Sequence, residues 1–269
     1  MLARAAPDLA GQGIHYTEME QFRSQVTRPL LYHDHADSPL EAPPKVAGRH
    51  VFFDENILAL VQDALAPSGL YPDGAERALK LASALQLQAP VLVLGIRNFA
   101  DYLPSLYCEA LKSTPFKPFA RFCVTALATL SWADLVERLA CAFPQSPILV
   151  YRAEDLRQRE AALLSWVTGG QISALPQPGK SQRQGFSDAA VRALHRLAKD
   201  RTLGSDGNCA AENPVGFDDL AACLEAHPRG AHSPAYAPWS ASERQTLDLI
   251  YQLDVARLHS LDRTTLWRP

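Results

Sequence analysis

Residues 91–107 read VLVLGIRNFADYLPSLY, and this stretch decides how the middle of the chain folds. Its first six residues form an almost continuous apolar run, which is typical of a parallel strand that is buried on both faces. Arg97 ends the run, and a helix is expected from about residue 101. In open parallel sheets, ligands bind beyond the carboxyl ends of the strands. The sequence therefore predicts that Arg97 lies where a ligand would bind.

Strands and helices alternate on both sides of this stretch. The segments HVFF (50–53) and SPILVY (146–151) predict further strands. Helices are expected over residues 54–65, 74–87, 101–112, 117–129, 132–143 and 158–168. This alternation is typical of an α/β fold with a mostly parallel sheet that is flanked by helices.

The two ends of the chain are predicted to be helical. Residues 2–11 and 17–27 have helical patterns that precede the first strand. Further helices are expected over residues 187–199, 214–226 and 240–260. Because no shift in composition marks a boundary, we expect a single domain over 1–269. Its α/β part should cover about 1–170, and its helical C-terminal part about 171–269.

The composition excludes several classes of protein. The 269 residues carry a formal net charge of −3, so no overall attraction to nucleic acid or to an anionic membrane is expected. No apolar stretch approaches the roughly 18 residues of a membrane span. The start of the chain lacks the pattern of a signal peptide, and its five cysteines show no CxxC or metal-binding spacing. We therefore expect a cytoplasmic protein with reduced thiols.

Arg97 and Ser105 have side chains that are suited to bind a phosphate group. A guanidinium offers paired N–H donors, and the serine hydroxyl falls in the first turns of the expected helix. The N-terminus of a helix also favours negative charge. On these residues alone, an ion pair between Arg97 and a nearby carboxylate, with a serine that merely packs, is the simpler explanation.

The segment IRNFADYLPSLY, with Arg97, Asn98, Ser105 and Tyr107, resembles the 3′-phosphate motif of bacterial sulfotransferases. In that family, an arginine at a strand end and a serine eight residues later bind the 3′-phosphate of 3′-phosphoadenosine 5′-phosphosulfate. Other segments resemble the family in the same order: VFFDENIL, ILVYRAEDLR, KSQRQGFSDAAVRALHRLA and PWSASERQTLDLIYQLDVARL. The resemblance implies a P-loop-type α/β fold, this nucleotide as co-substrate, and sulfonyl transfer to a hydroxyl or amine, for example on a glycan or lipid.

The first strand and phosphate loop of that family have no counterpart in this sequence. The opening segment MLARAAPDLAGQGIHY resembles the part of the family that comes directly after the loop. In the family, backbone N–H groups and a lysine of this loop hold the 5′-phosphosulfate. We therefore expect a break or altered pairing in the sheet, and little transferase activity. The alternative is a degenerate, non-catalytic module for nucleotide binding or protein interaction.

Sulfonyl transfer needs a base that takes the proton of the acceptor. Asp54 and Glu55 follow the strand HVFF, and the resemblance favours Glu55 as this base. Glu55 could equally complement the start of a helix. His33 is the alternative base, together with His35, because neutral imidazole accepts protons near pH 7. No further ligands at a suitable spacing accompany these histidines, so no metal is expected.

A polar loop later in the chain carries the remaining binding candidates. Lys180, Ser181, Arg183 and Gln184 lie between two glycines, which suits a flexible loop that closes over a phosphate. The resemblance places this loop near the 3′-phosphate and favours Arg183 as the contact, with Lys180 beside it. A solvated linker is an equally good explanation. The sequence identifies neither the acceptor nor the oligomeric state.

Overall fold

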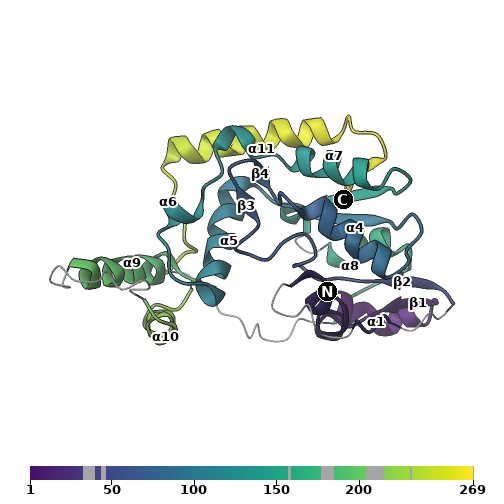
Figure 1. Cartoon of the computed structure of the whole chain (residues 1–269), viewed down its shortest axis with the longest axis horizontal. Helices are drawn as coiled ribbons and strands as arrows, with labels where there is room; N and C mark the ends of the chain where they lie inside the picture. The colour runs from purple at the N-terminus through teal and green to yellow at the C-terminus, as the bar shows by residue number, and fades with distance from the viewer. Residues whose placement is uncertain are drawn as a thin grey trace. The chain divides into compact units, whose positions relative to one another are not determined.

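The apolar run before Arg97 forms a strand of a parallel sheet in the computed structural model (Figure 1). Strand β5 (Leu92–Ile96) pairs with β6 (Ile148–Arg152), and β6 pairs with β7 (Thr264–Leu266). The register sets Ile96 opposite Arg152. Because all three strands run in the same direction, their carboxyl ends meet at one edge of the sheet. The chain thus has the α/β class that its sequence predicts.

The structure describes residues 1–32, 40–43, 47–156, 159–176, 185–203, 215–230 and 232–268. These residues belong to two units, each with its own packing. The first consists of Met1–Arg97, Thr129–Gln177 and Tyr251–Pro269, and the second of Asn98–Ala128 and Pro178–Ile250. The units therefore alternate along the sequence, which differs from the expected division near residue 170.

The first unit contains the parallel sheet and most of the N-terminal elements. Besides β5, β6 and β7, its elements are α1 (Leu2–Ala10), β1 (Ile14–Tyr16), α2 (Met19–Phe22), a π-helix (Arg23–Thr27), α3 (Arg28–Leu31), β2 (Arg49–Val51), β3 (Leu65–Ala66), β4 (Gly69–Leu70), α4 (Gly74–Ala84), α7 (Trp132–Ala142), a 3₁₀ turn (Ala153–Leu156) and α8 (Glu160–Thr168). Among the described residues, apolar clusters join its elements. Ala5 and Leu9 of α1 pack against Leu164 of α8, and Phe22 packs with Leu81 of α4.

The second unit is helical and has an aromatic core. Its elements are α5 (Phe99–Ser113), α6 (Phe119–Phe122), α9 (Asp188–Leu203) and α10 (Phe217–Ala226). Helix α11 (Ala241–Leu258) contributes its residues up to Ile250 here and the rest to the first unit. Tyr107 of α5 is buried and meets Phe119 edge to face at 5.3 Å between ring centroids. Its hydroxyl lies 3.0 Å from His195 Nε2.

Asp254 fixes the start of α7 within the first unit. Its carboxylate is buried, and it accepts hydrogen bonds from Ser131 Oγ at 2.6 Å and from the backbone N–H groups of Trp132 and Ala133. Ser131 in turn accepts from the N–H of Asp134, as an N-cap does. Burial raises the pKa of Asp254, and these hydrogen bonds oppose that rise only in part.

The prediction of a helix over 54–65 is wrong, because this stretch consists of turns and irregular segments and its last residue begins β3. The Asp54 carboxylate accepts from the N–H of Asn56 at 3.0 Å. The Arg77 guanidinium donates hydrogen bonds to the carbonyls of Asn56 at 2.9 Å and Ile57 at 3.1 Å. Backbone groups that would form the first helical turns are therefore bonded to side chains instead.

Two other expected helices are divided. Residues 17–27 form α2 and a π-helix, and α3 continues from them. Residues 117–129 form only α6 and a 3₁₀ turn (Leu127–Thr129). In the second case Phe119 is anchored in the aromatic core, and Tyr107 Oη donates to the carbonyl of Lys117 at 2.7 Å. Tertiary packing thus overrides the helical pattern of this stretch.

The C-terminal part is not entirely helical, because β7 lies in it. The three residues of β7 complete the sheet through a pairing with β6 that spans more than a hundred residues of sequence. Such a short strand after a long helix gives no periodic signal.

The strands do not form one continuous sheet. Among the described residues, β1 pairs only with β2, β3 only with β4, and β5 only with β6. Strand β5 is therefore an edge strand, and it is not buried on both faces: Val91 and Val93 are 53% and 44% exposed. The expected break in sheet pairing is confirmed. In the part of the chain that the structure describes, no helix is long and apolar enough to cross a membrane.

Candidate functional site

Arg97 is exposed at the carboxyl end of β5. Its carbonyl accepts a hydrogen bond from Nε1 of the buried Trp132 at 2.9 Å, which fixes the backbone at this point. The guanidinium forms no hydrogen bond or ion pair with any residue that the structure describes. The ion pair that local chemistry suggested is therefore not formed within the described part, and all five N–H donors remain available.

Arg152 ends β6, beside Ile96 in the register of the sheet. Its Nε and Nη2 donate to the two carboxylate oxygens of Asp155 at 2.7 and 2.9 Å. This hydrogen-bonded pair raises the pKa of Arg152 and fixes the orientation of its side chain. Its Nη1 has no partner among the described residues, so one edge of the guanidinium keeps its donors.

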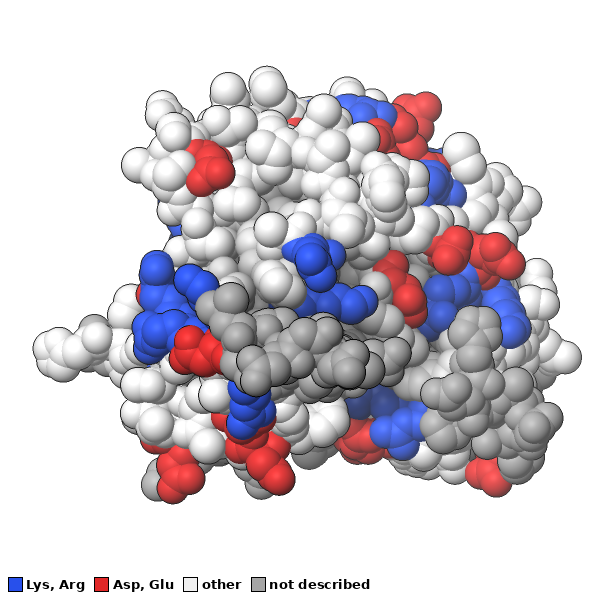
Figure 2. Space-filling model, turned by 60° about the vertical axis from the view of Figure 1, so that its left-hand side comes forward, with Lys and Arg blue, Asp and Glu red and all other residues white. Residues whose placement is uncertain are grey.

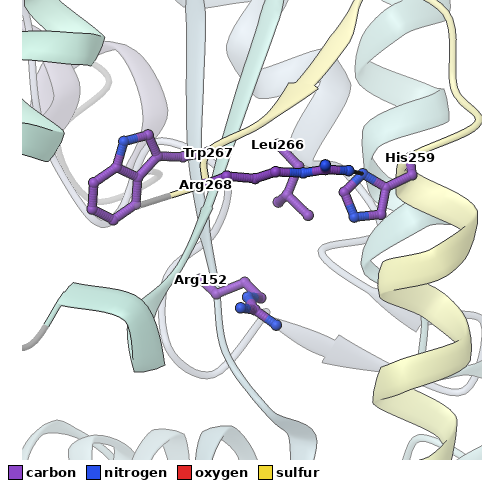
Figure 3. Close-up of a pocket in the computed structure, with 5 residues that line it drawn as sticks. All are labelled: Arg152, His259, Leu266, Trp267 and Arg268. Carbon is purple, nitrogen blue, oxygen red and sulfur yellow. Dashed lines mark hydrogen bonds between the residues drawn. The ribbon is translucent and has the colours of Figure 1, made fainter.

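A pocket of about 250 Å³ lies next to Arg152. Its lining consists of Arg152, His259, Leu266, Trp267 and Arg268. Figure 3 shows Arg268 reaching His259, and Arg152 extending toward the same side from the neighbouring strand, whereas Trp267 points away. The carboxyl edge of this sheet therefore carries an arginine at the end of each strand: Arg97, Arg152 and Arg268.

Ser105 lies on α5, which belongs to the second unit. Its side chain is exposed, and it has no hydrogen-bond partner among the residues described. Asn98 caps the helix, because its Oδ1 accepts a hydrogen bond from the N–H of Ala100 at 2.9 Å. Its Nδ2 donates a second hydrogen bond to Asp248 at 2.8 Å. Asn98 is therefore used structurally, while a phosphate contact by Ser105 stays a prediction.

Glu55 and Asp54 belong to a network centred on Arg23. The Arg23 Nη2 lies 2.9 Å from Asp54 Oδ1 and 2.9 Å from Glu55 Oε2. Thr27 Oγ1 adds a hydrogen bond to Asp54 Oδ2 at 2.6 Å. The side chains of Arg23 and Asp54 are 6% and 0% exposed, whereas that of Glu55 is 47% exposed. Glu55 is therefore held by an ion pair, and its role as a base stays a prediction.

The other predicted site residues lie outside the described residues. They are the alternative bases His33 and His35, and the loop contacts Lys180 and Arg183. Within the described ranges, no three His, Cys, Asp or Glu side chains are close enough to hold a metal ion.

The cysteines that the structure describes are free thiols. They are Cys108, Cys123, Cys141 and Cys223. Burial raises the pKa of Cys108 to about 12 and also raises that of Cys123. A thiol with a raised pKa is a poor nucleophile, so these two half-buried side chains are packing residues.

Sequence reasoning missed Arg268 and His259 as candidate site residues. His259 follows α11, and Arg268 follows the short strand β7, so neither stands beside a long apolar run. Arg152 does carry a signal, because it directly follows the strand SPILVY. The acidic residues after Arg152 are the more conspicuous feature of that segment. One of them, Asp155, accepts a hydrogen bond from Arg152.

On the face that Figure 2 shows, charged side chains do not gather into one large patch of a single sign. Figure 2 shows Lys and Arg side chains next to Asp and Glu side chains over the visible face. With a formal net charge of −3, attraction of an anion must depend on local groups. The arginines at the carboxyl edge are such a group.

The side chains at the carboxyl edge define the chemistry that this part of the sheet can support. Comparison of the chain with protein-family models, with curated proteins and with solved structures gave no match. The residues at the edge offer hydrogen-bond donors and positive charge, which bind oxyanions such as phosphate and sulfate.

Proposed function

We propose that this chain is a sulfotransferase-like protein of P-loop type that binds 3′-phosphoadenosine 5′-phosphosulfate or adenosine 3′,5′-bisphosphate. One observation carries the proposal. Arg97 presents a guanidinium that no described residue pairs with, at the carboxyl end of a parallel strand and on a backbone that Trp132 anchors. This is the place at which open α/β sheets bind ligands. The corresponding reaction is sulfonyl transfer to a hydroxyl or amine acceptor.

The sulfotransferase resemblance assigns the other contacts. Ser105 would donate its hydroxyl to the 3′-phosphate that Arg97 binds, and Arg183 and Lys180 would assist from their loop. The exposed side chain of Ser105 supports this assignment, because its hydroxyl is not used by another described residue. The transfer step would in addition require the phosphate loop of the family, for which residues 1–269 show no counterpart.

A second function is a nucleotide-binding module without transferase activity. The ion pair between Glu55 and Arg23 favours it, because it gives the Glu55 carboxylate a structural partner that requires no proton transfer. The two functions share the nucleotide site and differ in the transfer step. Transfer of sulfonate from the nucleotide to any of a panel of hydroxyl and amine acceptors would exclude the second function.

The nucleotide site is tested by calorimetric titration with adenosine 3′,5′-bisphosphate. Arg97→Ala removes charge-assisted hydrogen bonds worth about 1.5–3 kcal/mol, so we expect affinity to fall about tenfold or more. Arg121→Ala is the matched control, because Arg121 is an exposed arginine on α6 with no described partner. Equal affinity of wild type and Arg97→Ala, or no binding by wild type, would contradict the proposal.

A further inference from the structure

The pocket at the ends of β6 and β7 is separate from the proposed contact at Arg97. Arg97 does not line it. The lining brings two arginines and a histidine from three segments that are distant in sequence: the end of β6, the residue after α11 and the second residue after β7. Among the described residues that line it there is no carboxylate, although Glu154 and Asp155 lie close to Arg152 in sequence.

The donors of this pocket are only partly used. Arg152 gives Nε and Nη2 to Asp155 and keeps Nη1. Arg268 Nη2 lies 3.5 Å from His259 Nδ1, which is longer than an ordinary hydrogen bond. Each of the three side chains therefore keeps at least one N–H for a ligand. Because the three side chains come from separate segments and offer separate N–H groups, a group with three or more acceptor oxygens fits them better than a planar carboxylate.

The pocket walls are held by the fold. Leu258 and Trp267 are buried directly before His259 and Arg268, and they anchor the two exposed side chains. Trp267 N–H donates to the carbonyl of Val150 at 2.8 Å, so the chain after β7 stays attached to β6. Such anchoring lowers the conformational entropy that ligand binding would cost.

The size of the pocket limits its ligand. A volume of about 250 Å³ is below the roughly 300–1,000 Å³ of sites for drug-sized molecules. It suits an ion or the terminal group of a larger molecule. Leu266 gives the pocket an apolar wall, which strengthens the attraction between the cations and an anion.

We propose that Arg152, His259 and Arg268 form a binding site for a tetrahedral oxyanion, phosphate or sulfate. The anion enters either as the free ion or as the terminal group of a phosphate or sulfate monoester. This site acts in addition to the nucleotide contact at Arg97 and does not depend on it.

The test is a calorimetric titration with inorganic phosphate, repeated with sulfate and with glycerol 3-phosphate. Wild type should bind phosphate, and Arg268→Ala should weaken binding about tenfold or more. Arg268→Lys should restore part of the loss, because it keeps the charge and loses the planar fork. Arg121→Ala is again the control and should bind as wild type does. Arg268 is exposed, so its replacement should leave the fold intact.

Each outcome decides the proposal. Binding of glycerol 3-phosphate as tightly as phosphate supports a terminal monoester group, and binding of the inorganic ions alone supports a free ion. Equal phosphate affinity of wild type and Arg268→Ala, or no phosphate binding by wild type, overturns the proposal. Adenosine 3′,5′-bisphosphate also carries phosphate monoesters, so both ligands are titrated against both variants. Arg97→Ala should weaken only bisphosphate binding, whereas Arg268→Ala should weaken phosphate binding and leave the contact at Arg97 intact, so failure of this site and failure of the proposed function are distinguishable.

Discussion

Arg23 and Arg97 show two opposite uses of the same side chain. Arg23 is 5% exposed, and three carboxylates, those of Glu20, Asp54 and Glu55, lie within 2.9 Å of its guanidinium. Arg97 is exposed and has no described partner. Burial opposes the charge of Arg23, yet the hydrogen bond and charge of Asp54 raise its pKa above the ordinary arginine value. One arginine has its charge compensated within the fold, and the other has its donors available for a ligand.

The Arg23 network and Arg97 both lie close to the end of a strand. Asp54 and Glu55 follow β2, as Arg97 follows β5, so both positions fit the rule that ligands bind at strand ends. What separates them is the neighbouring element. The π-helix (Arg23–Thr27) supplies Arg23 and Thr27 to the first position, whereas Trp132 meets only the backbone of the second.

The largest effect is expected from Asp54→Ala, which tests whether Arg23 depends on its carboxylates. The substitution leaves a buried guanidinium with only the more exposed Glu20 and Glu55 as partners. Breaking a buried ion pair costs about 3–5 kcal/mol, because the remaining buried charge loses the partner that is buried with it. Urea unfolding at neutral pH should show a loss of stability of this size. A loss below about 1 kcal/mol would mean that the Arg23 network is not different in kind from an exposed charge.

Much of the fold follows from patterns that are local in sequence. The apolar periodicity of α1, α4, α9 and α11 and the apolar runs of β5 and β6 predict these elements within a few residues. The failed helix over 54–65 depends on Arg77, a side chain that lies more than ten residues away and takes carbonyls of Asn56 and Ile57. Local periodicity contains no information about such a long-range competitor.

The candidate site divides in the same way. Arg97 is predictable, because it directly follows an apolar run that forms a strand. Arg268 and His259 become site residues only through the pairing of β7 with β6, which joins Val150 to Leu266. This pairing depends on tertiary packing around a strand of three residues, so the sequence alone gives it little weight.

Asp254→Ala tests a second buried charge, one that is satisfied by hydrogen bonds rather than by an arginine. The carboxylate accepts from Ser131 and from the N–H groups that begin α7. Its removal leaves these donors without a partner and should cost about 1–3 kcal/mol at pH 7, a smaller loss than that of Asp54→Ala. A loss as large as that of Asp54→Ala would contradict the distinction between the two kinds of network.

The same substitution has a predicted pH dependence. Burial raises the pKa of Asp254 in the folded state above the unfolded value near 3.8. The folded state therefore favours the protonated form, so this contribution to stability is fully present below pH 3.8 and is lost as pH rises through the folded pKa. The stability difference between wild type and Asp254→Ala should thus be greater at low pH than at pH 7. The opposite trend in urea unfolding curves would contradict the raised pKa.

The smallest effect is expected from Glu55→Gln, which tests whether Glu55 acts as a buried partner of Arg23 or as an exposed charge. Its carboxylate touches Arg23 like that of Asp54, but its side chain is 47% exposed, so solvent screens the ion pair. Exposed pairs contribute about 0–1 kcal/mol, and Asp54 still compensates Arg23 in this variant. Urea unfolding should therefore show a loss below about 1 kcal/mol, and affinity for adenosine 3′,5′-bisphosphate should stay unchanged. A loss near that of Asp54→Ala would make Glu55 an equal partner in the buried network. If stability is unchanged and sulfonyl transfer is lost, the result would instead support Glu55 as the base. A residue with a purely structural role would alter unfolding and leave transfer intact.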